Sequence, residues 1–208
     1  MKDIKVVVFD CDGVLFNTEK ANMAYYNQIL THFGRSPMTS DQLAYVNMYT
    51  VDDALAFLFD KDMELIMKAQ TYRKTMSYHS FISHMEIEPY LKPLLKKLRP
   101  RFKTAIATNR TDTMDSVLDE HELEGCFDLV VSALDVERPK PYPDSLIKVL
   151  EYFKITPSNA IYIGDSKLDE IAAKAVEIRL IAYNNSSLSA DFHIKSLNEI
   201  EDIMRIKG

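Results

Sequence analysis

Short runs of apolar residues, many of them β-branched, alternate along this chain with longer stretches in which apolar residues recur at helical spacing. Each short run is bounded by polar or turn-forming residues, which is typical of strands buried on both faces of a sheet. The predicted strands are residues 4–9, 104–107, 129–131, 160–163 and 178–182. The helices predicted to alternate with them or follow them are residues 89–98, 113–121, 143–153, 167–175 and 196–206. This order predicts an α/β fold, a doubly wound parallel sheet with right-handed crossovers.

The interval of residues 18–88 breaks this alternation. It is rich in Met, Tyr, Ala and Leu at helical spacing and has no convincing strand. The helices predicted here are residues 18–33, 40–47, 50–59 and 62–77, with a break at Gly34 and Pro37. We therefore predict an α/β core made of residues 1–17 and 89–208, and an inserted all-helical domain made of residues 18–88.

The composition narrows the classes of protein to consider. With 47% hydrophobic residues among 208, the chain can bury a substantial core. A formal net charge of −6 argues against a nucleic-acid partner, because such proteins need a basic face. Cys11 and Cys126 give no disulfide framework, so a reducing, cytoplasmic setting is expected. The N-terminal apolar run is too short to span a bilayer and lacks a cleavage site, so we expect no membrane partner and a mature protein that begins near Met1.

Two aspartates follow the first predicted strand. Asp10 and Asp12 are two residues apart, so in extended backbone both carboxylates project in the same direction, and Gly13 allows a sharp turn after them. Ligands of open α/β sheets bind beyond the carboxyl ends of the strands. Aspartates in loops are commonly turn formers or solvated charges, but two carboxylates beside a buried strand repel each other and favour a divalent cation. Cys11, between them, should face the opposite side and pack in the core.

The predicted strand 104–107 is followed by a threonine hydroxyl and by backbone N–H groups that could bind an anion. Thr108 stands where its hydroxyl leaves the sheet, and Asn109 and Arg110 open the next helix, where backbone N–H groups suit an anion. The simpler interpretation is that Thr108 only caps that helix.

The third and fourth strands are followed by a lysine and by two more acids. Lys140 lies between Pro139 and Pro141, which stiffen the backbone and aim the side chain, although surface lysines in proline-rich loops are common. Asp165 and Asp169 are four residues apart, which puts them on one face of a helix. Asp169 would also complement the dipole of that helix. Taken together, the four strand ends supply the groups that phosphoryl transfer requires.

With these motifs in this order, the chain resembles the haloacid dehalogenase superfamily of phosphohydrolases, in the branch with a helical cap inserted after the first motif. The resemblance spans essentially the whole chain and rests on DCDGVLFNT, ATNR, RPKPYPD and GDSKLDE. The ATN triplet is more similar to phosphoglycolate phosphatases than to β-phosphoglucomutases. Asn17, where relatives often carry Asp, and the PYLKP stretch around Pro89 depart from the family pattern without touching the chemistry, but they weaken the transfer of a specific substrate.

The resemblance implies a role for each matched residue. Asp10 is the nucleophile and Asp12 the general acid and base. The implied phosphate-binding residues are Thr108, Asn109 and Lys140, and the candidate for a further substrate contact is Arg110. The implied ligands of Mg²⁺ are Asp10, the backbone carbonyl of Asp12, and Asp165, with Asp169 supporting the metal through water or by direct contact. The expected function is a magnesium-dependent phosphatase that hydrolyses a small phosphate ester through an aspartyl-phosphate.

Other functions use parts of the same set of residues. A phosphomutase of the β-phosphoglucomutase type shares the catalytic motifs, and the sequence leaves this alternative open. A dehalogenase is disfavoured because it has no use for an acid at position 12. A phospho-receiver would carry its aspartate on a later strand, and an inactive binding module would be expected to have lost a key residue. Nothing in the sequence indicates an oligomeric state.

The helical insertion is the least legible part of the chain. Six of its residues could line a pocket, although packing between helices is favoured for each: Tyr25, Tyr26, Met48, Tyr49, Tyr72 and His79. Further contacts to an anion are most readily supplied by Arg35, Arg73 and Arg110, with a solvated surface position favoured for the first two.

Overall fold

The computed structural model describes residues 3–99 and 101–206, and it contains a six-stranded parallel sheet with helices on both faces. The strand order across the sheet is β5 (Leu129–Val131), β4 (Lys103–Ala107), β1 (Val6–Phe9), β6 (Ala160–Gly164), β7 (Arg179–Tyr183) and β8 (Phe192–Ile194). The chain builds outward from β1 first in one direction and then in the other, as a doubly wound sheet does. The predicted fold class is therefore confirmed, and the point where the winding reverses lies at β1.

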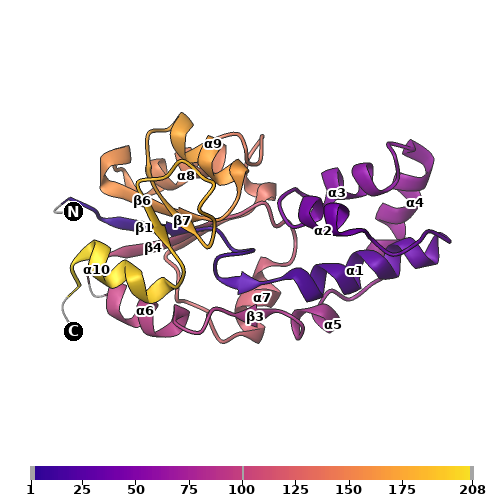
Figure 1. Cartoon of the computed structure of the whole chain (residues 1–208), viewed down its shortest axis with the longest axis horizontal. Helices are drawn as coiled ribbons and strands as arrows, with labels where there is room; N and C mark the ends of the chain where they lie inside the picture. The colour runs from indigo at the N-terminus through magenta and orange to yellow at the C-terminus, as the bar shows by residue number, and fades with distance from the viewer. Residues whose placement is uncertain (1–2, 100, 207–208) are drawn as a thin grey trace.

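Alternate residues of β1 pack into two different hydrophobic clusters. Val7 and Phe9 belong to the cluster that contains helices α6 (Leu91–Leu98), α7 (Met114–Glu120) and α10 (Ile200–Met204). Val6 and Val8 belong to the cluster that contains α8 (Asp144–Phe153) and α9 (Lys167–Ala175). Figure 1 shows α8 and α9 above the sheet and α6 and α10 below it. Because both faces are covered, all four residues of β1 are buried.

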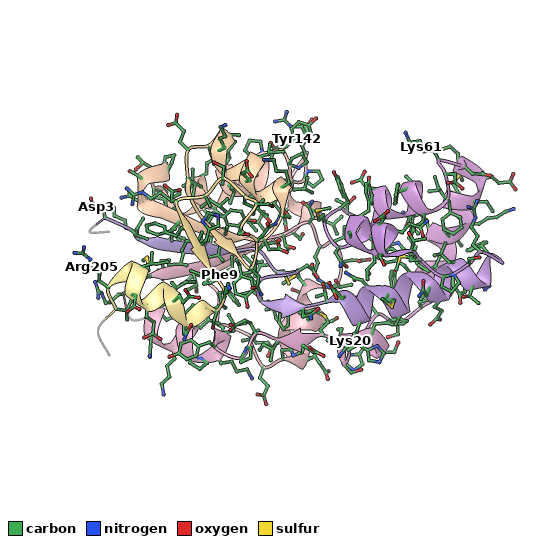
Figure 2. The ribbon with its side chains drawn as sticks, in the orientation of Figure 1. Asp3, Phe9, Lys20, Lys61, Tyr142 and Arg205 are labelled. Carbon is green, nitrogen blue, oxygen red and sulfur yellow. The ribbon has the colours of Figure 1, made fainter. Side chains whose placement is uncertain are left out.

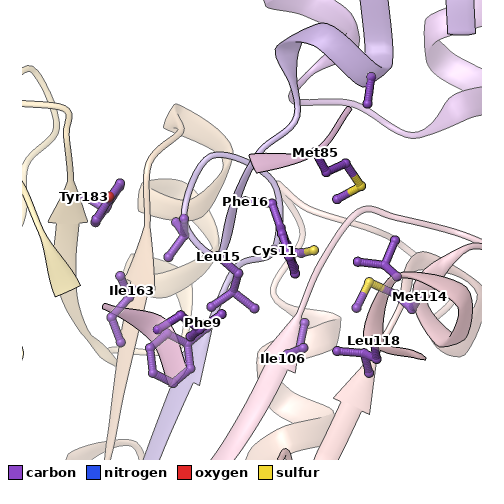
Figure 3. Packing of buried hydrophobic residues seen from close by; sticks show 14 of the residues in the cluster. Phe9, Cys11, Leu15, Phe16, Met85, Ile106, Met114, Leu118, Ile163 and Tyr183 are labelled. Carbon is purple, nitrogen blue, oxygen red and sulfur yellow. The ribbon is translucent and has the colours of Figure 1, made fainter. Parts of the chain in front are cut away.

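Cys11 packs in the first of these clusters, as expected from its position between the two aspartates. It is fully buried, and Figure 3 shows it among Phe16, Ile106 and Met114. Burial raises the pKa of its thiol well above the usual value, which keeps the group protonated.

Along the chain, a helical insertion lies between β1 and β4, the next strand of the six-stranded sheet. Its helices are α1 (Glu19–His32), α2 (Ser40–Val46), α3 (Val51–Leu58), α4 (Met63–Arg73) and α5 (His79–Ile82), and in Figure 1 they extend away from the sheet, opposite to both termini. Figure 2 shows the same arrangement, with Lys61 in the insertion and Asp3 and Arg205 at the other end of the molecule. Side-chain oxygens of Thr39, Thr50 and Asp62 accept backbone N–H groups at the starts of α2, α3 and α4. These caps explain why three of the predicted helix starts agree with the structure within one residue.

The structure differs from the sequence-based prediction at short elements. The insertion is not free of strand: β2 (Phe16–Asn17) pairs antiparallel with β3 (Glu86–Ile87) where the chain leaves and re-enters the core. The helix predicted over residues 62–77 ends at Arg73, and the hydroxyl of Thr75 then bonds to the carbonyl of Tyr72. The predicted helix 196–206 is a 3₁₀ turn, Leu197–Glu199, followed by α10.

Of the predicted core segments, 1–17 and 89–208, residues 1, 2, 100, 207 and 208 lie outside the described residues. Among the residues that are described, no helix combines the length and apolar character needed to cross a membrane.

Candidate active site

The residues predicted from four strand ends lie around one cavity, between the sheet and the helical insertion. Its core side is lined by Asp10, Asp12, Thr108, Asn109, Arg110, Lys140 and Asp165. The cavity adjoins the carboxyl end of β1, where the winding of the sheet reverses, which is the usual ligand position in open α/β sheets. Asp169 does not line the cavity and lies directly behind it, fully buried.

Asp10 follows β1 and Asp165 follows the neighbouring strand β6, so that ligand oxygens of the two carboxylates lie within 4.8 Å of each other. Asp10 is buried, and its Oδ1 accepts the backbone N–H of Cys11 at 2.7 Å. Gly13 has φ = +81°, a conformation that favours glycine, and a Cβ at this position would lie 2.1 Å from Oδ2 of Asp165. Glycine is thus required here both by the backbone and by the carboxylate that packs against it.

Lys140 connects two of the carboxylates. Its Nζ lies 2.8 Å from Oδ1 of Asp10, 2.7 Å from Oδ1 of Asp169 and 3.0 Å from the hydroxyl of Tyr162. Its backbone is held by Asn109, which accepts from the N–H of Lys140 at 2.9 Å and donates to its carbonyl at 3.0 Å. The amide of Asn109 also donates to the carbonyl of Met48 in the insertion at 3.1 Å. The side chain of Asn109 therefore aligns the lysine loop, and its backbone N–H remains the group suited to phosphate.

Asp169 is held by donors on both carboxylate oxygens. As the third residue of α9 it forms a capping box with Ser166, and its Oδ2 accepts the N–H groups of Asp165 and Ser166. Its Oδ1 accepts from Lys140 and, at 2.6 Å, from the hydroxyl of Tyr162. These bonds suit a role in orienting Lys140 and the turn at Asp165.

The carboxylates differ in how easily they ionise. Burial raises the pKa of Asp10 to about 7, against the opposing effect of Lys140. Burial and the neighbouring Asp10 and Asp169 raise the pKa of Asp165 to about 8. Burial acts in the same direction on Asp169, but Lys140, Ser166 and Tyr162 outweigh it and hold the pKa of that group below its usual value. The site thus contains more negative charge than Lys140 alone can balance.

This charge pattern fits a divalent cation. Ligand oxygens of Asp10, Asp165 and Asp169 lie within 4.8 Å of one another, and carboxylates are ligands that Mg²⁺ prefers. The close approach of Asp165 to Gly13 brings its carboxylate next to the backbone of the Asp12 turn. The residues present therefore suit a magnesium ion held between β1 and β6.

Arg110 makes a two-point ion pair with Asp12. Its Nη2 lies 2.8 Å from Oδ1 and its Nε 2.9 Å from Oδ2, and only 7% of the Arg110 side chain is exposed. The backbone N–H of Arg110 donates to Oγ1 of Thr108 at 3.1 Å. The helix predicted over residues 113–121 begins at Met114, within one residue of the prediction. Contrary to expectation, Asn109 and Arg110 do not open it but lie in a loop, residues 108–113, along the cavity.

The insertion supplies the opposite wall of the cavity. The sequence favours packing between helices for six residues of the insertion, but four of them line this cavity: Tyr25, Tyr26, Met48 and Tyr49. The other two do not: Tyr72 stacks on His32 at 3.7 Å, and His79 is exposed near Glu120.

Of the three arginines predicted as possible anion contacts, Arg73 and Arg110 line the cavity and Arg35 does not. Arg35 pairs with Asp60. The expectation of a solvated Arg73 is wrong, because its side chain is 13% exposed and lines the cavity, where the insertion folds back over the core.

Sequence reasoning does not single out Tyr162 and Tyr78, although both contact the site. Tyr162 lies in the middle of β6, where its hydroxyl meets Lys140 and Asp169. A tyrosine inside an apolar strand needs a polar partner, and that requirement is the signal in the sequence. Tyr78 accepts a hydrogen bond from Arg110 at 3.0 Å, a contact across the insertion that spacing alone does not reveal.

An α/β fold with paired aspartates, a buried lysine and further acids at its strand ends defines a hydrolase site of the phosphotransfer type. The family model described as haloacid dehalogenase-like hydrolase matches residues 7–183. The chain therefore belongs to the haloacid dehalogenase-like hydrolases, and the predicted enzyme class, a hydrolase of phosphoric esters, is confirmed at the level of this family.

Individual relatives agree with this assignment. The chain is 27% identical over 189 residues to pyrophosphatase PpaX of Bacillus mycoides, covering 86% of this chain and 83% of the relative. A haloacid dehalogenase superfamily hydrolase of subfamily IA from Geobacter sulfurreducens is 32% identical, with 97% of each chain covered and a TM-score of 0.80. The fold is also similar to that of β-phosphoglucomutase from Clostridium difficile, with 18% identity, 97% and 96% of the two chains covered, and a TM-score of 0.82.

Proposed function

We propose that this chain is a magnesium-dependent phosphatase that hydrolyses a small phosphorylated metabolite through an aspartyl-phosphate on Asp10. The observation that carries the proposal is the position of the Asp10 carboxylate. It lies at the end of β1, 2.8 Å from the Lys140 ammonium, and it lines the cavity together with Asp12, Thr108 and Asp165. An anionic nucleophile can meet a phosphoryl group there beside a fixed positive charge.

In the first step, an oxygen of Asp10 attacks phosphorus in line while the bond from phosphorus to the leaving oxygen breaks. Asp12 gives that oxygen its proton. In the second step, Asp12 takes a proton from water, which attacks the same phosphorus and releases the Asp10 carboxylate and phosphate. Lys140 and Thr108 hold the phosphoryl oxygens throughout, and Arg110 must release Asp12 for the proton transfers.

Magnesium would be held by Asp10, Asp165 and the backbone carbonyl of Asp12, and it would offset the negative charge of the carboxylates and the phosphoryl group. Asp169 would support this arrangement by fixing Lys140 and the turn at Asp165. The insertion, residues 18–88, would act as a cap that excludes bulk water, because its side chains form the far wall of the cavity.

A substrate panel with magnesium tests this proposal. It should include pyrophosphate, phosphoglycolate and hexose 1-phosphates, and free phosphate should be followed separately from isomerised sugar phosphate. We expect phosphate release that disappears in chelator and returns with Mg²⁺, and inhibition by Ca²⁺, which prefers a larger and more flexible coordination shell. Isomer formation faster than phosphate release would show that the enzyme is a phosphomutase and not a phosphatase. Full activity in chelator would exclude the metal-dependent mechanism.

A further inference from the structure

Two guanidinium groups line the cavity in addition to the Lys140 ammonium. Arg110 follows β4, and Arg73 ends α4 in the insertion, so the two groups come from opposite walls of the cavity. Both side chains are largely buried, with exposures of 7% and 13%. A buried guanidinium keeps its charge and needs an anion or other acceptors nearby.

A pair of tyrosines from the insertion lies beside Arg110 in this cavity. The rings of Tyr25 and Tyr78 lie 5.2 Å apart, edge to face. Arg110 donates to the hydroxyl of Tyr78, and its guanidinium carbon is 5.2 Å from the centre of that ring. Tyr25 and Arg73 line the same cavity. Because aromatic side chains have few rotatable bonds, this pair restricts where the Arg110 charge can lie, and Arg73 is held by its bonds to Gln70 and Asp112.

Within the described part of the chain, neither arginine has a buried carboxylate partner whose only role is to neutralise its charge. Asp12, the partner of Arg110, is needed for proton transfer under the proposed function. Asp112, the partner of Arg73, is 54% exposed and lies 3.4 Å away, at the long end of the hydrogen-bond range. The guanidinium of Arg73 has five N–H donors, and its bonds to Gln70 and Asp112 leave capacity for another acceptor.

We propose that Arg73 and Arg110 form a subsite for an anionic leaving group, so that the substrate carries a carboxylate or a second phosphate close to the oxygen of the bond that breaks. This inference rests on the proposed phosphatase function and adds its substrate class. Under that function Lys140 lies with Asp10 beside the phosphoryl group, and Arg73 lines the same cavity from the insertion, the wall opposite the sheet. A leaving-group anion would also compete with Asp12 for Arg110 and so free the acid for proton transfer.

Arg73 is the better residue to change, because it contacts neither Asp10 nor Asp12 among the described residues. A matched pair of substrates isolates the charge: phosphoglycolate and 2-hydroxyethyl phosphate have the same length and differ in a carboxylate against an alcohol. We expect the wild-type enzyme to prefer phosphoglycolate by at least about tenfold in kcat/KM, as one charge-assisted hydrogen bond allows. Pyrophosphate serves as the third substrate and shows whether a phosphate is accepted in place of the carboxylate.

The Arg73→Gln variant should lose at least about tenfold in kcat/KM for the preferred anionic substrate and under about threefold for 2-hydroxyethyl phosphate. Most of the loss should appear in KM, and Arg73→Lys should recover part of it. The control is Arg35→Gln, which removes an arginine of the same insertion that pairs with Asp60 and does not line the cavity. This control should leave both values unchanged.

Binding to the Asp10→Asn variant in the presence of Mg²⁺ separates the two proposals, because it requires no turnover. Calorimetry should show phosphoglycolate or pyrophosphate binding more tightly than 2-hydroxyethyl phosphate, with the difference lost in Asp10→Asn combined with Arg73→Gln. Equal binding of charged and neutral esters, or an equal loss for both in the Arg73 variant, would overturn the subsite. If charge-selective binding is present but the wild-type enzyme hydrolyses no ester, including p-nitrophenyl phosphate, the subsite stands and the phosphatase proposal fails.

Discussion

Replacing Lys140 with methionine should destabilise the metal-free protein strongly and in a pH-dependent way. The ammonium of Lys140 is buried between Asp10 and Asp169, at 2.8 Å and 2.7 Å. Methionine keeps most of the volume of the side chain and removes its charge. The carboxylates then remain buried without the cation that balances them.

The expected loss follows from the burial of both partners. Removing one partner of a buried ion pair costs about 3–5 kcal/mol, which for a chain of this size corresponds to a fall in Tm of about 6–20 °C. The pKa of Asp10 in the folded wild type is about 7, and without Lys140 it must rise further. Between pH 6 and 8 the wild type releases this proton while the variant retains it, which adds about 1.4 kcal/mol to the relative loss of stability of the variant over that interval.

Urea or thermal unfolding in chelator at pH 6 and pH 8 measures this difference. The matched control is Lys148→Met, which removes a half-exposed lysine that lies 3.6 Å from Asp135 and should cost under about 0.5 kcal/mol. A loss below about 1 kcal/mol at pH 8, or an equal loss at both pH values, would refute the claim that Lys140 balances the buried carboxylates.

Other predictions address the proton transfers and the metal. Asp12→Ala should slow turnover by about 100- to 10,000-fold at saturating Mg²⁺, since it removes the general acid and base, and a steady-state assay that finds a smaller loss would exclude that role. The folded pKa values of Asp10 and Asp165, about 7 and about 8, exceed the ordinary carboxyl value, so the stability of the metal-free protein should fall as pH rises from about 4 to about 8. Magnesium should consequently raise Tm more at pH 8 than at pH 6, and an equal or reversed effect in thermal unfolding would contradict the proposed ligands.

The buried strands were the part of the fold that the sequence predicted best. A run such as that of β1 is apolar at every position because helices cover both faces of the sheet, and such β-branched runs are typical of strands in doubly wound sheets. The short elements β2, β3 and β8 have two or three residues each and depend on their pairing partners, so no local pattern predicts them. The early end of α4 is likewise set by local hydroxyl bonding that helical spacing does not reveal.

The residues around Asp10 could be anticipated because the ends of neighbouring parallel strands meet at one edge of the sheet. The contacts of the insertion could not. Arg73 and Tyr78 reach the cavity only because the insertion folds back over the core, and that approach depends on contacts such as the bond from Asn109 to the carbonyl of Met48. The spacing of apolar residues along a helix identifies its buried face. It does not identify which part of the protein that face will contact, because this is set by the tertiary structure.

The most direct test of the account is to locate the phosphate on the protein during turnover. Wild type and Asp12→Ala, given labelled substrate and Mg²⁺ and stopped rapidly in acid, should carry the label on the peptide that contains Asp10, and Asp10→Asn should carry none and release phosphate at under about a tenth of the wild-type rate. Label on another residue, or undiminished phosphate release by a folded Asp10→Asn variant, would contradict the assignment of Asp10 as the nucleophile.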